Sequence, residues 1–448
     1  MSRNHGIRHL HGVRRPIQRA CLAAIAAVAV ALGVGPTLAA AQPATSVNYP
    51  GGSSATRFTG TAFDTCTAPT TAQMQAWLAS SYRGIGVYIG GANRTCAQPQ
   101  LTASWVTTVS RQGWSVVPVY MGLQAPCTYR PNAHKITPSL AASQGRSQAA
   151  DAISRARALG MRSGSAIYGD MEHYDPTNSS CRTTVLTYLS AWTLELHRQG
   201  YVSGVYAHQN SGALHLSQAY DSSAYARPDV LWIARWDLNP ALTGWPGISN
   251  LHWANGQRGK QYRGDHTETW GGVRLNIDSD RFDAPVASAG LPFRVTSTVP
   301  LNYRSAPSTS AAALGSYPPG TTVRVMCQTY GTKVYTTAVW DRLGNGAYST
   351  DYYLSTPSKT TYSKPLPKCT YPYQTTPPSL NRRAGPGSTY ALRGTLPAGS
   401  LAWVSCQAPG SRVNSTVVWD RLSDGTWVSD YYVSSPSTTT YSSPIRRC

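Results

Sequence analysis

Two acidic residues spaced two positions apart, Asp170 and Glu172, are the leading candidates for chemistry in this sequence. They end an apolar segment at 165–172 that predicts an extended strand, in which alternate side chains share one face. Their Cα atoms would lie about 6.6 Å apart. Two carboxyl groups this close raise the pKa of one of them, which gives a protonated acid beside an ionised neighbour. We predict Glu172 as the acid, although two solvated residues at a strand end would show the same spacing.

The strand that carries this pair belongs to an alternating series of strands and helices. Candidate helices lie between the strands, at 71–80, 139–159 and 183–199 among others. Eight alternations over about 230 residues predict an α/β fold, a (β/α)₈ TIM-like barrel over residues 58–290. The eight apolar runs typical of buried parallel strands are 60–64, 84–91, 114–122, 165–172, 201–207, 230–236, about 251–262 and 273–278.

Polar residues stand at the C-terminal ends of these strands, where barrels of this class carry their sites. Acids from four strands would share one rim, which predicts a site for a carbohydrate or a related polar ligand. The strand-end residues are Asp64, Tyr120, Asp170, Glu172, Trp236, Asp237, Gln261, Tyr262 and Asp278.

The first 41 residues have the pattern of a secretory signal peptide. Five Arg and no acidic residue surround the start of an apolar run at 20–34, and Ala39–Ala41 offers a cleavage site. Arg14-Arg15 allows twin-arginine export, and the route stays open. The run is shorter than the roughly 20 residues that span a bilayer, and no later segment is comparable. We expect a protein outside the membrane, secreted or bound to the cell wall, with a flexible Gly-, Pro-, Ser- and Thr-rich leader at 42–57.

The chain that follows the predicted signal is basic, with 34 Lys and Arg against 19 Asp and Glu. From residue 292 onward the counts are 15 and 5, and such a surface favours polyanions. The basic residues are scattered singly without a nucleic-acid-binding motif. We therefore expect an anionic cell-wall polymer such as peptidoglycan as the partner, no nucleic acid, and a monomer.

Eight cysteines follow residue 41, an even number that predicts disulfides in an exported chain. Cys327 with Cys369 and Cys406 with Cys448 each span 42 positions, which places one bridge in each C-terminal repeat. Three pairings are open for the other four; we favour Cys66 with Cys96 and Cys127 with Cys181. The Cys and His spacings do not suggest zinc, and Asp278, Asp280 and Asp283 lack the Gly and terminal Glu of an EF-hand. We expect no metal and no cofactor.

The C-terminal third is two copies of one sequence, at 291–369 and 370–448. A shift of 79 positions places Val339–Leu343 on Val418–Leu422 and Asp351–Tyr353 on Asp430–Tyr432. Short β-rich runs with Gly-containing turns predict two small all-β modules. We expect Trp340 and Trp419 in their cores and the Tyr pairs at their surfaces, where aromatic faces stack on sugars or peptides. Two linked modules would raise avidity.

Several of these motifs carry family resemblances. The strand-end segments resemble glycoside hydrolase family 25 lysozymes: Phe63-Asp64, Gly169–Glu172, Gly204–Tyr206, Leu231–Trp236, Gln261-Tyr262 and Ile277–Phe282. Phe63–Pro69 and Tyr88–Gly91 more closely resemble a glycoside-hydrolase-like domain of secreted actinobacterial proteins, over about 58–290. In the repeats, Leu301–Ser305 and Leu380–Ala384 resemble bacterial SH3-like domains, which implies binding of wall peptide or glycan.

The barrel resemblance implies roles for individual residues. Glu172 corresponds to the general acid and Asp64, Asp170 and Asp278 to surrounding carboxylates, whereas Asp280 stands where family 25 usually has Asn. Two functions remain open: muramidase-type hydrolysis of peptidoglycan, or non-catalytic wall or glycan binding on a degenerate barrel. The candidate substrate-binding residues are Tyr88, Tyr120, Tyr206, Trp236, Asp237 and Gln261.

Overall fold

The computed structural model describes residues 56–254 and 256–448. The expected signal peptide at 1–41 and the leader up to residue 55 lie outside the described residues. Thr56 and Arg57, which we assigned to the leader, begin the first strand. None of the helices in the described residues has the length and apolar composition needed to cross a membrane.

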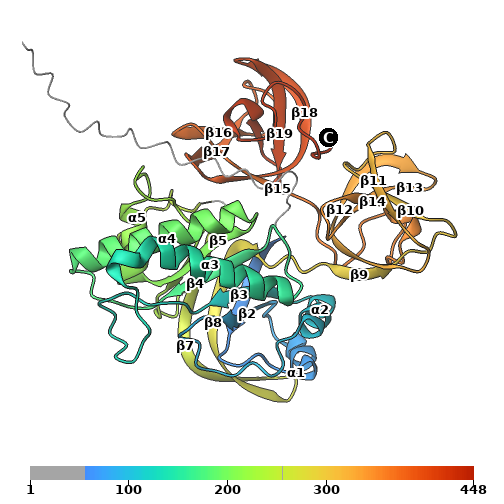
Figure 1. Cartoon of the computed structure of the whole chain (residues 1–448). Coiled ribbons are helices and arrows are strands. Elements are labelled where there is room, and N and C mark those ends of the chain that lie inside the picture. The colour runs from blue at the N-terminus through green and yellow to red at the C-terminus, as the bar shows by residue number, and fades with distance from the viewer. Residues whose placement is uncertain (1–55, 255) are drawn as a thin grey trace, which may run out of the picture. The chain divides into compact units, whose positions relative to one another are not determined.

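Eight strands close into a barrel in sequence order, as the sequence predicts (Figure 1). Strands β1 to β7 run parallel to one another. The strands are β1 (Thr56–Asp64), β2 (Gly84–Gly90), β3 (Ser115–Tyr120), β4 (Ala166–Met171), β5 (Val202–His208), β6 (Val230–Ala234), β7 (Arg258–Trp270) and β8 (Val273–Val286).

Helices connect the first strands and cover the outside of the barrel. They are α1 (Thr71–Ala76) with a 3₁₀ turn at Trp77–Ala79, α2 (Ala103–Gln112), α3 (Ala141–Ala158), α4 (Ser179–Arg198) and α5 (Leu214–Gln218). Local signals fix their ends: Thr70 and Gln73 form a capping box at α1, and the Asn178 side chain accepts from the Cys181 N–H at α4. Gly113 ends α2 in the left-handed conformation, at φ 100°.

The last part of the barrel departs from the expected alternation. The described residues between β6 and β7 form no helix, and β7 and β8 form a hairpin through Gly271 and Gly272, both at positive φ. Strand β8 therefore runs antiparallel to both β7 and β1. Asp278, which we expected at the end of a parallel strand, lies within β8 opposite Asp64. The reversed direction of β8 is what brings its carboxyl group to the common rim.

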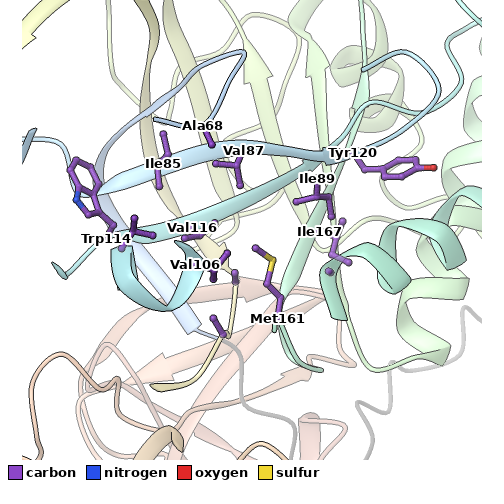
Figure 2. Packing of buried hydrophobic residues seen from close by; sticks show 14 of the residues in the cluster. Ala68, Ile85, Val87, Ile89, Val106, Trp114, Val116, Tyr120, Met161 and Ile167 are labelled. Carbon is purple, nitrogen blue, oxygen red and sulfur yellow. The ribbon is translucent and has the colours of Figure 1, made fainter. Parts of the chain in front are cut away.

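Two apolar layers stabilise the barrel wall. Ile85, Val87 and Ile89 alternate along β2 and face the helices, where they pack with side chains such as Val106 of α2 (Figure 2). Inside the barrel, Tyr168, Trp232 and Phe282 meet at steep angles with ring centroids 5.0 to 6.1 Å apart. Each such buried side chain contributes about 1.5–3 kcal/mol. The barrel interior is consequently a packed core below the rim.

We call residues 291–369 module 1 and residues 370–448 module 2. Each is a six-stranded antiparallel sheet (Figure 1). Read from the first strand of each module, the orders are equivalent: β9-β12-β13-β14-β10-β11 and β15-β18-β19-β20-β16-β17. Trp340 and Trp419 are buried in the two modules, as predicted. The strands are β9 (Leu291–Arg294), β10 (Leu301–Arg304), β11 (Ala313–Tyr317), β12 (Thr322–Val334), β13 (Thr337–Leu343), β14 (Tyr348–Thr350), β15 (Tyr371–Gln374), β16 (Ser379–Arg383), β17 (Leu392–Pro397), β18 (Leu401–Val413), β19 (Thr416–Leu422) and β20 (Trp427–Ser429).

Four disulfides join the cysteines in the pairs that the sequence favours. Two lie in the barrel domain and one in each module, with Cα–Cα distances of 5.0 to 6.0 Å, which is normal for disulfides. The pairs are Cys66–Cys96, Cys127–Cys181, Cys327–Cys369 and Cys406–Cys448.

Each module buries two neighbouring carboxyl groups. In module 2, Gln407 Nε2 donates to Oδ1 of Asp420 at 2.8 Å and of Asp430 at 3.1 Å. Among the described residues, no donor reaches Oδ2 of either group. Burial raises the pKa of Asp420 well above its usual range, and the charge of Asp430 adds to this shift. In module 1, Gln328 bridges Asp341 and Asp351 in the same way.

This carboxyl pair predicts that module 2 loses stability as pH rises. Burial raises the pKa of Asp430 to about 6. Its stabilising contribution is complete below the unfolded-state pKa of about 3.9 and is lost as pH rises through about 6. Hydrogen-exchange protection of β18 and β19, corrected for intrinsic rates, should therefore decline between about pH 4 and 7. We expect Asp430→Asn to weaken this decline and Asp424→Asn, at an ion-paired surface residue, to preserve it. An equal decline in all three proteins would contradict the assignment.

Candidate functional site

A cleft of about 210 Å³ opens at the barrel rim, between the loops that follow β1 to β4 and the β7–β8 hairpin. Three of the four carboxylates predicted as catalytic, Asp64, Glu172 and Asp278, line it. The fourth, Asp170, is 4% exposed and lies close enough to interact electrostatically with Asp64 and Glu172. The structure therefore gathers acids from β1, β4 and β8 at one place.

Gln261 of β7 holds two of these carboxylates. Its Nε2 donates to Oδ2 of Asp64 at 2.7 Å and to Oδ2 of Asp278 at 3.2 Å. Its Oε1 accepts from the hydroxyl of Tyr206 at 2.9 Å and from Nε1 of Trp236 at 2.8 Å. All four polar contacts orient one side chain that is 2% exposed. Gln261, which we predicted to bind substrate, thus connects the two carboxylates to Tyr206 and Trp236 beneath the cleft.

The protonation of this group is set by burial. Burial and the negative charge of Asp278 raise the pKa of Asp64 to about 7, although the hydrogen bond from Gln261 opposes the shift. Burial also raises the pKa of Asp278, against the donated N–H of Asp265. Below them, Asp280 is fully buried, accepts from Trp232 Nε1 at 3.1 Å, and has a pKa well above its usual range because of burial. Several of these carboxyl groups are therefore protonated near neutral pH.

Gln124 fixes the end of β4. Its Nε2 donates to the backbone carbonyl of Asp170 and its Oε1 accepts from the N–H of Glu172, both at 2.8 Å. Gln124 is fully buried. Burial raises the pKa of Asp170 well above its usual range, and the charge of Glu172 adds to this shift. Among the described residues, Oδ1 of Asp170 has no hydrogen-bond donor.

Two arginines also line the cleft. Arg130 Nη1 lies 3.2 Å from Oε1 of Glu172, in an ion pair whose two side chains are partly exposed. Arg94 follows β2 and donates from Nη1 to the backbone carbonyl of Tyr88 at 3.4 Å. The cleft therefore holds both negative and positive groups.

Strand β7 reaches this geometry through irregular pairing with β8. The register shifts between Gln261 and Arg263 and again between Arg263 and His266. Within the second irregularity Asp265 has a left-handed backbone, at φ 33°, and directs its N–H to Oδ1 of Asp278. Bulges of this kind re-aim side chains near active sites, and strained backbone often marks functional positions.

The remaining candidate residues occupy different environments. Tyr88 lines the cleft, and its hydroxyl donates to Oδ1 of Asp64 at 3.4 Å. Trp236 is 63% exposed at the rim. Asp237 does not line the cleft. Burial opposes its ionisation, but hydrogen bonds from Lys260 and Arg235 lower its pKa to about 2. Tyr120 points out of the barrel toward α3, where its hydroxyl donates to Asp151 at 2.8 Å (Figure 2).

Sequence reasoning missed four residues of the site: Gln124, Arg94, Arg130 and Asp265. The first three lie in loops that follow β2 and β3, and such loops build the active face of a barrel. Their position after a strand was a usable signal, but nothing in the sequence shows their partners. Among the described residues, no group of three His, Cys, Asp or Glu side chains is arranged to hold a metal ion.

One family model matches most of the barrel domain. Residues 75–282 match the family model of the Rv2525c-like, glycoside hydrolase-like domain. This confirms the resemblance that we stated for the barrel. The SH3-like resemblance of the two modules stays a prediction, with which their all-β sheets agree.

The chain is also similar to solved structures. The Tat-secreted protein Rv2525c of Mycobacterium tuberculosis is 17% identical, over 50% of this chain and 96% of that chain, with a TM-score of 0.36. A muramidase from Acremonium alcalophilum is 17% identical, over 50% and 92%, with a TM-score of 0.30. The spore cortex lytic enzyme SleM of Clostridium perfringens is 12% identical, over 77% and 85%, with a TM-score of 0.34. No curated protein matches the chain. At these scores the structural matches imply nothing about function.

The Gln261 network yields a prediction about stability and ionisation. Gln261→Leu removes a donor from Asp64 and from Asp278, so the free energy of unfolding should fall by about 1–3 kcal/mol. The pKa of Asp64 should rise above about 7, because the lost hydrogen bond lowers it. Denaturant unfolding and carboxyl ¹³C NMR titration would measure both effects. Gln148→Leu on α3 is the matched control; an unchanged Asp64 pKa in Gln261→Leu would contradict the network.

Proposed function

We propose that the barrel hydrolyses an N-acetylated cell-wall glycan by a muramidase-type reaction. The observation that carries this proposal is the pair of acids at the end of β4, Asp170 and Glu172. Asp170 is buried beside Glu172, and its Oδ1 lacks a donor among the described residues. An unpaired buried acceptor is costly unless a ligand supplies the missing donor. The acetamide N–H of an N-acetylated sugar is such a donor.

The chemistry follows the substrate-assisted form of glycoside hydrolysis. Protonated Glu172 donates its proton to the leaving glycosidic oxygen while the acetamide oxygen attacks the anomeric carbon, which breaks the glycosidic bond and forms a cyclic intermediate. Asp170 accepts the acetamide N–H. As positive charge develops on that nitrogen, the carboxylate form of Asp170 becomes favoured. Water then attacks the anomeric carbon and gives a proton to Glu172, which restores the starting state.

Asp64 and Asp278 line the same cleft as Glu172 and would face the sugar ring. The positive charge that develops at the ring favours their ionised forms, and Gln261 keeps both side chains oriented during this change. Preorganised groups aimed at developing charge are a major source of catalysis. We assign Asp64 and Asp278 to electrostatic stabilisation of the transition state.

The modules are proposed to hold the protein on the wall. In module 1, Tyr335 is 68% exposed at a turn with φ 49°, which is uncommon outside glycine. Its ring centroid lies 4.8 Å from that of Tyr352, and Tyr352 lies 4.9 Å from Tyr353. In module 2, Asn414 occupies the position of Tyr335. Module 1 therefore has the larger cluster of contacting tyrosine rings at this position, and we propose that a sugar or peptide stacks on it.

Export completes the proposal. Four disulfides fit a chain that folds in an oxidising compartment. We therefore assign the protein to the cell surface or its surroundings, with the signal predicted at 1–41. The basic composition from residue 292 onward favours attachment to anionic wall polymers.

A second function is favoured by the ion pair between Arg130 and Glu172. In that arrangement Glu172 is neutralised by a cation, so the barrel would hold a glycan without cleaving it. Cleavage requires that substrate binding separates this pair and returns a proton to Glu172. Release of reducing ends distinguishes a hydrolase from a binding protein.

Substitution of the proposed acid tests the hydrolase directly. The mature protein should release reducing ends from purified wall, and Glu172→Gln should lower the rate at least about 100-fold because general acid catalysis contributes 10²–10⁴-fold. Glu195→Gln on α4 is the matched control and should retain activity, and circular dichroism checks the fold. Turnover retained by Glu172→Gln would contradict the role of Glu172 as the acid. No turnover by the unmodified protein would leave the binding function in place of hydrolysis.

Wall attachment through module 1 is tested separately. Tyr335→Ala should weaken cosedimentation with purified wall by about 3- to 10-fold, the effect of one aromatic stacking contact. Hydrolysis of a soluble wall oligosaccharide should be unchanged, because the barrel is not altered. Tyr390→Ala, at an exposed tyrosine of module 2 outside this cluster, serves as the control. Equal cosedimentation of the two variants would contradict the assignment.

A further inference from the structure

We propose that His266 is a positioning residue for the cleft, because its side-chain contacts fix the bulge of β7 that aims the Asp265 N–H at Asp278. This inference rests on the role proposed for Asp278 and adds the residues that hold that carboxyl group in place. It does not require that a glycan is cleaved. The argument comes from the contacts on either side of Asp278.

The bulge inserts one extra residue into β7. Between Arg263 and His266, three steps along β7 match two steps along β8. Within this segment Asp265 has φ 33° and directs its N–H to Oδ1 of Asp278. A positive φ outside glycine is strained and persists only where surrounding contacts hold it. The direction of this N–H therefore depends on what fixes the bulge.

His266 is fixed through one ring nitrogen. Its side chain is 7% exposed, and Nε2 lies 3.1 Å from Oε1 of Glu268 and 3.1 Å from Oγ of Ser279. The hydroxyl of Tyr82 completes this group, because it lies 2.7 Å from Oγ of Ser279 and donates to Oε1 of Glu268 at 3.0 Å. Among the described residues, Nδ1 of His266 is buried without a hydrogen-bond partner. The orientation of the imidazole thus depends on Nε2.

Glu268 is itself held as a charged acceptor. Trp270 Nε1 donates to its Oε2 at 2.7 Å. Burial opposes the ionisation of Glu268, but hydrogen bonds from Trp270, His266 and Tyr82 lower its pKa. A carboxylate can only accept, so Nε2 of His266 carries the hydrogen of this contact. Hydrogen bonds to an ionised acceptor are stronger than neutral ones, which makes Glu268 a firm anchor for the imidazole.

The bulge is attached to β8 on both sides of Asp278. Before Asp278 in the chain, Asn276 Nδ2 donates to Oδ1 of Asp265 at 2.9 Å. After Asp278, Ser279 contacts His266. Two consecutive bulge residues are therefore each fixed to a near neighbour of Asp278, and the N–H of the first one reaches Asp278 itself. Without the contacts of His266, one of these two attachments is lost.

The same bulge supports a second donor to Asp278. A Cβ atom on Gly264 would lie 2.3 Å from the indole of Trp236, so this ring lies directly against the glycine backbone. From this position Trp236 Nε1 donates to Oε1 of Gln261 at 2.8 Å, and Gln261 donates to Oδ2 of Asp278 at 3.2 Å. Both hydrogen bonds to Asp278 therefore depend on the path of residues 264–266. Groups that act on a substrate need this kind of support from neighbouring side chains.

His266 can act on Asp278 in two ways, through the bulge and through its own charge. Burial raises the pKa of Asp278, and the charges of Asp265 and Glu172 add to this shift. The N–H of Asp265 and the charge of His266 oppose it. Substitution by glutamine separates the two effects, because a glutamine amide can donate to Glu268 but carries no charge.

Hydrogen exchange of the mature protein, followed by NMR, measures the hydrogen bond from the Asp265 N–H directly. His266→Phe keeps a ring but removes Nε2, so protection of the Asp265 amide should fall by about 10- to 100-fold, the loss expected for a hydrogen bond to a charged group. His266→Gln should retain most of this protection. Ser279→Ala, which keeps the imidazole but removes its contact on β8, should lose about 3- to 10-fold. His134→Phe, at an exposed histidine, is the control and should retain full protection.

Carboxyl ¹³C titration gives a second readout. The pKa of Asp278 should rise more in His266→Phe than in His266→Gln, because only the first substitution removes the N–H of Asp265 together with the charge. Thermal unfolding of each variant checks the fold.

The outcomes separate this inference from the proposed hydrolysis. Unchanged protection of Asp265 in His266→Phe, or in Ser279→Ala where the first variant does not fold, would overturn it. An equal rise of the Asp278 pKa in His266→Phe and His266→Gln would also overturn it, because the charge of His266 would then act alone. Loss of protection that glutamine restores supports it, even where the protein releases no reducing ends from wall; hydrolysis alone then fails. Release of reducing ends together with unchanged protection supports hydrolysis and overturns the role of His266.

Discussion

The burial of carboxyl groups above an aromatic core is the constraint on which the site depends. Tyr168, Trp232 and Phe282 fill the barrel interior, so the acids at its mouth have little water beneath them. Burying a charged carboxylate costs several kcal/mol unless hydrogen bonds or counter-charges compensate. Two features reduce this cost in the barrel. Burial raises the pKa values of Asp170 and Asp280, and buried donors such as Gln261 form hydrogen bonds to the carboxyl groups. The burial that costs stability also raises the pKa values of the carboxyl groups, and it thereby provides protonated acids for catalysis.

This constraint explains why amides are so prominent. Gln124 and Gln261 each contact two groups of the site, and neither carries a charge that would compete with a substrate. In the modules, Gln328 and Gln407 play the equivalent part between paired aspartates. A buried glutamine supplies both a donor and an acceptor at fixed spacing. The barrel and the modules thus use one solution for crowded carboxyl groups, although only the barrel opens them to a cleft.

The sequence was informative where local patterns decide the structure. Apolar runs located most of the strands, because buried strands leave a clear signal, and Cys spacing indicated the disulfide in each module. The run predicted at about 251–262 was misplaced: β7 begins at Arg258 and continues to Trp270, where its side chains alternate between partly buried and exposed. The antiparallel direction of β8 could not be predicted, since an apolar run reads the same in either direction. The face of Tyr120 was also hidden: Val117 and Val119 point inward and Val116 outward, so both faces of β3 are apolar. The role of Gln124 could not be predicted because its partners lie about 46 residues away in the chain. The bulge at Asp265 could not be predicted because it depends on the pairing of β7 with β8.

The central claim is that Asp170 and Glu172 act together on the acetamide of a wall glycan. The most direct test compares the rate at which the mature protein releases reducing ends from purified wall glycan and from the same glycan after N-deacetylation. The acetylated glycan should release reducing ends, and the rate should be at least about 100-fold lower after deacetylation, because the internal nucleophile and its hydrogen bond to Asp170 are both lost. Equal rates on the two glycans, or no release from either, would contradict it.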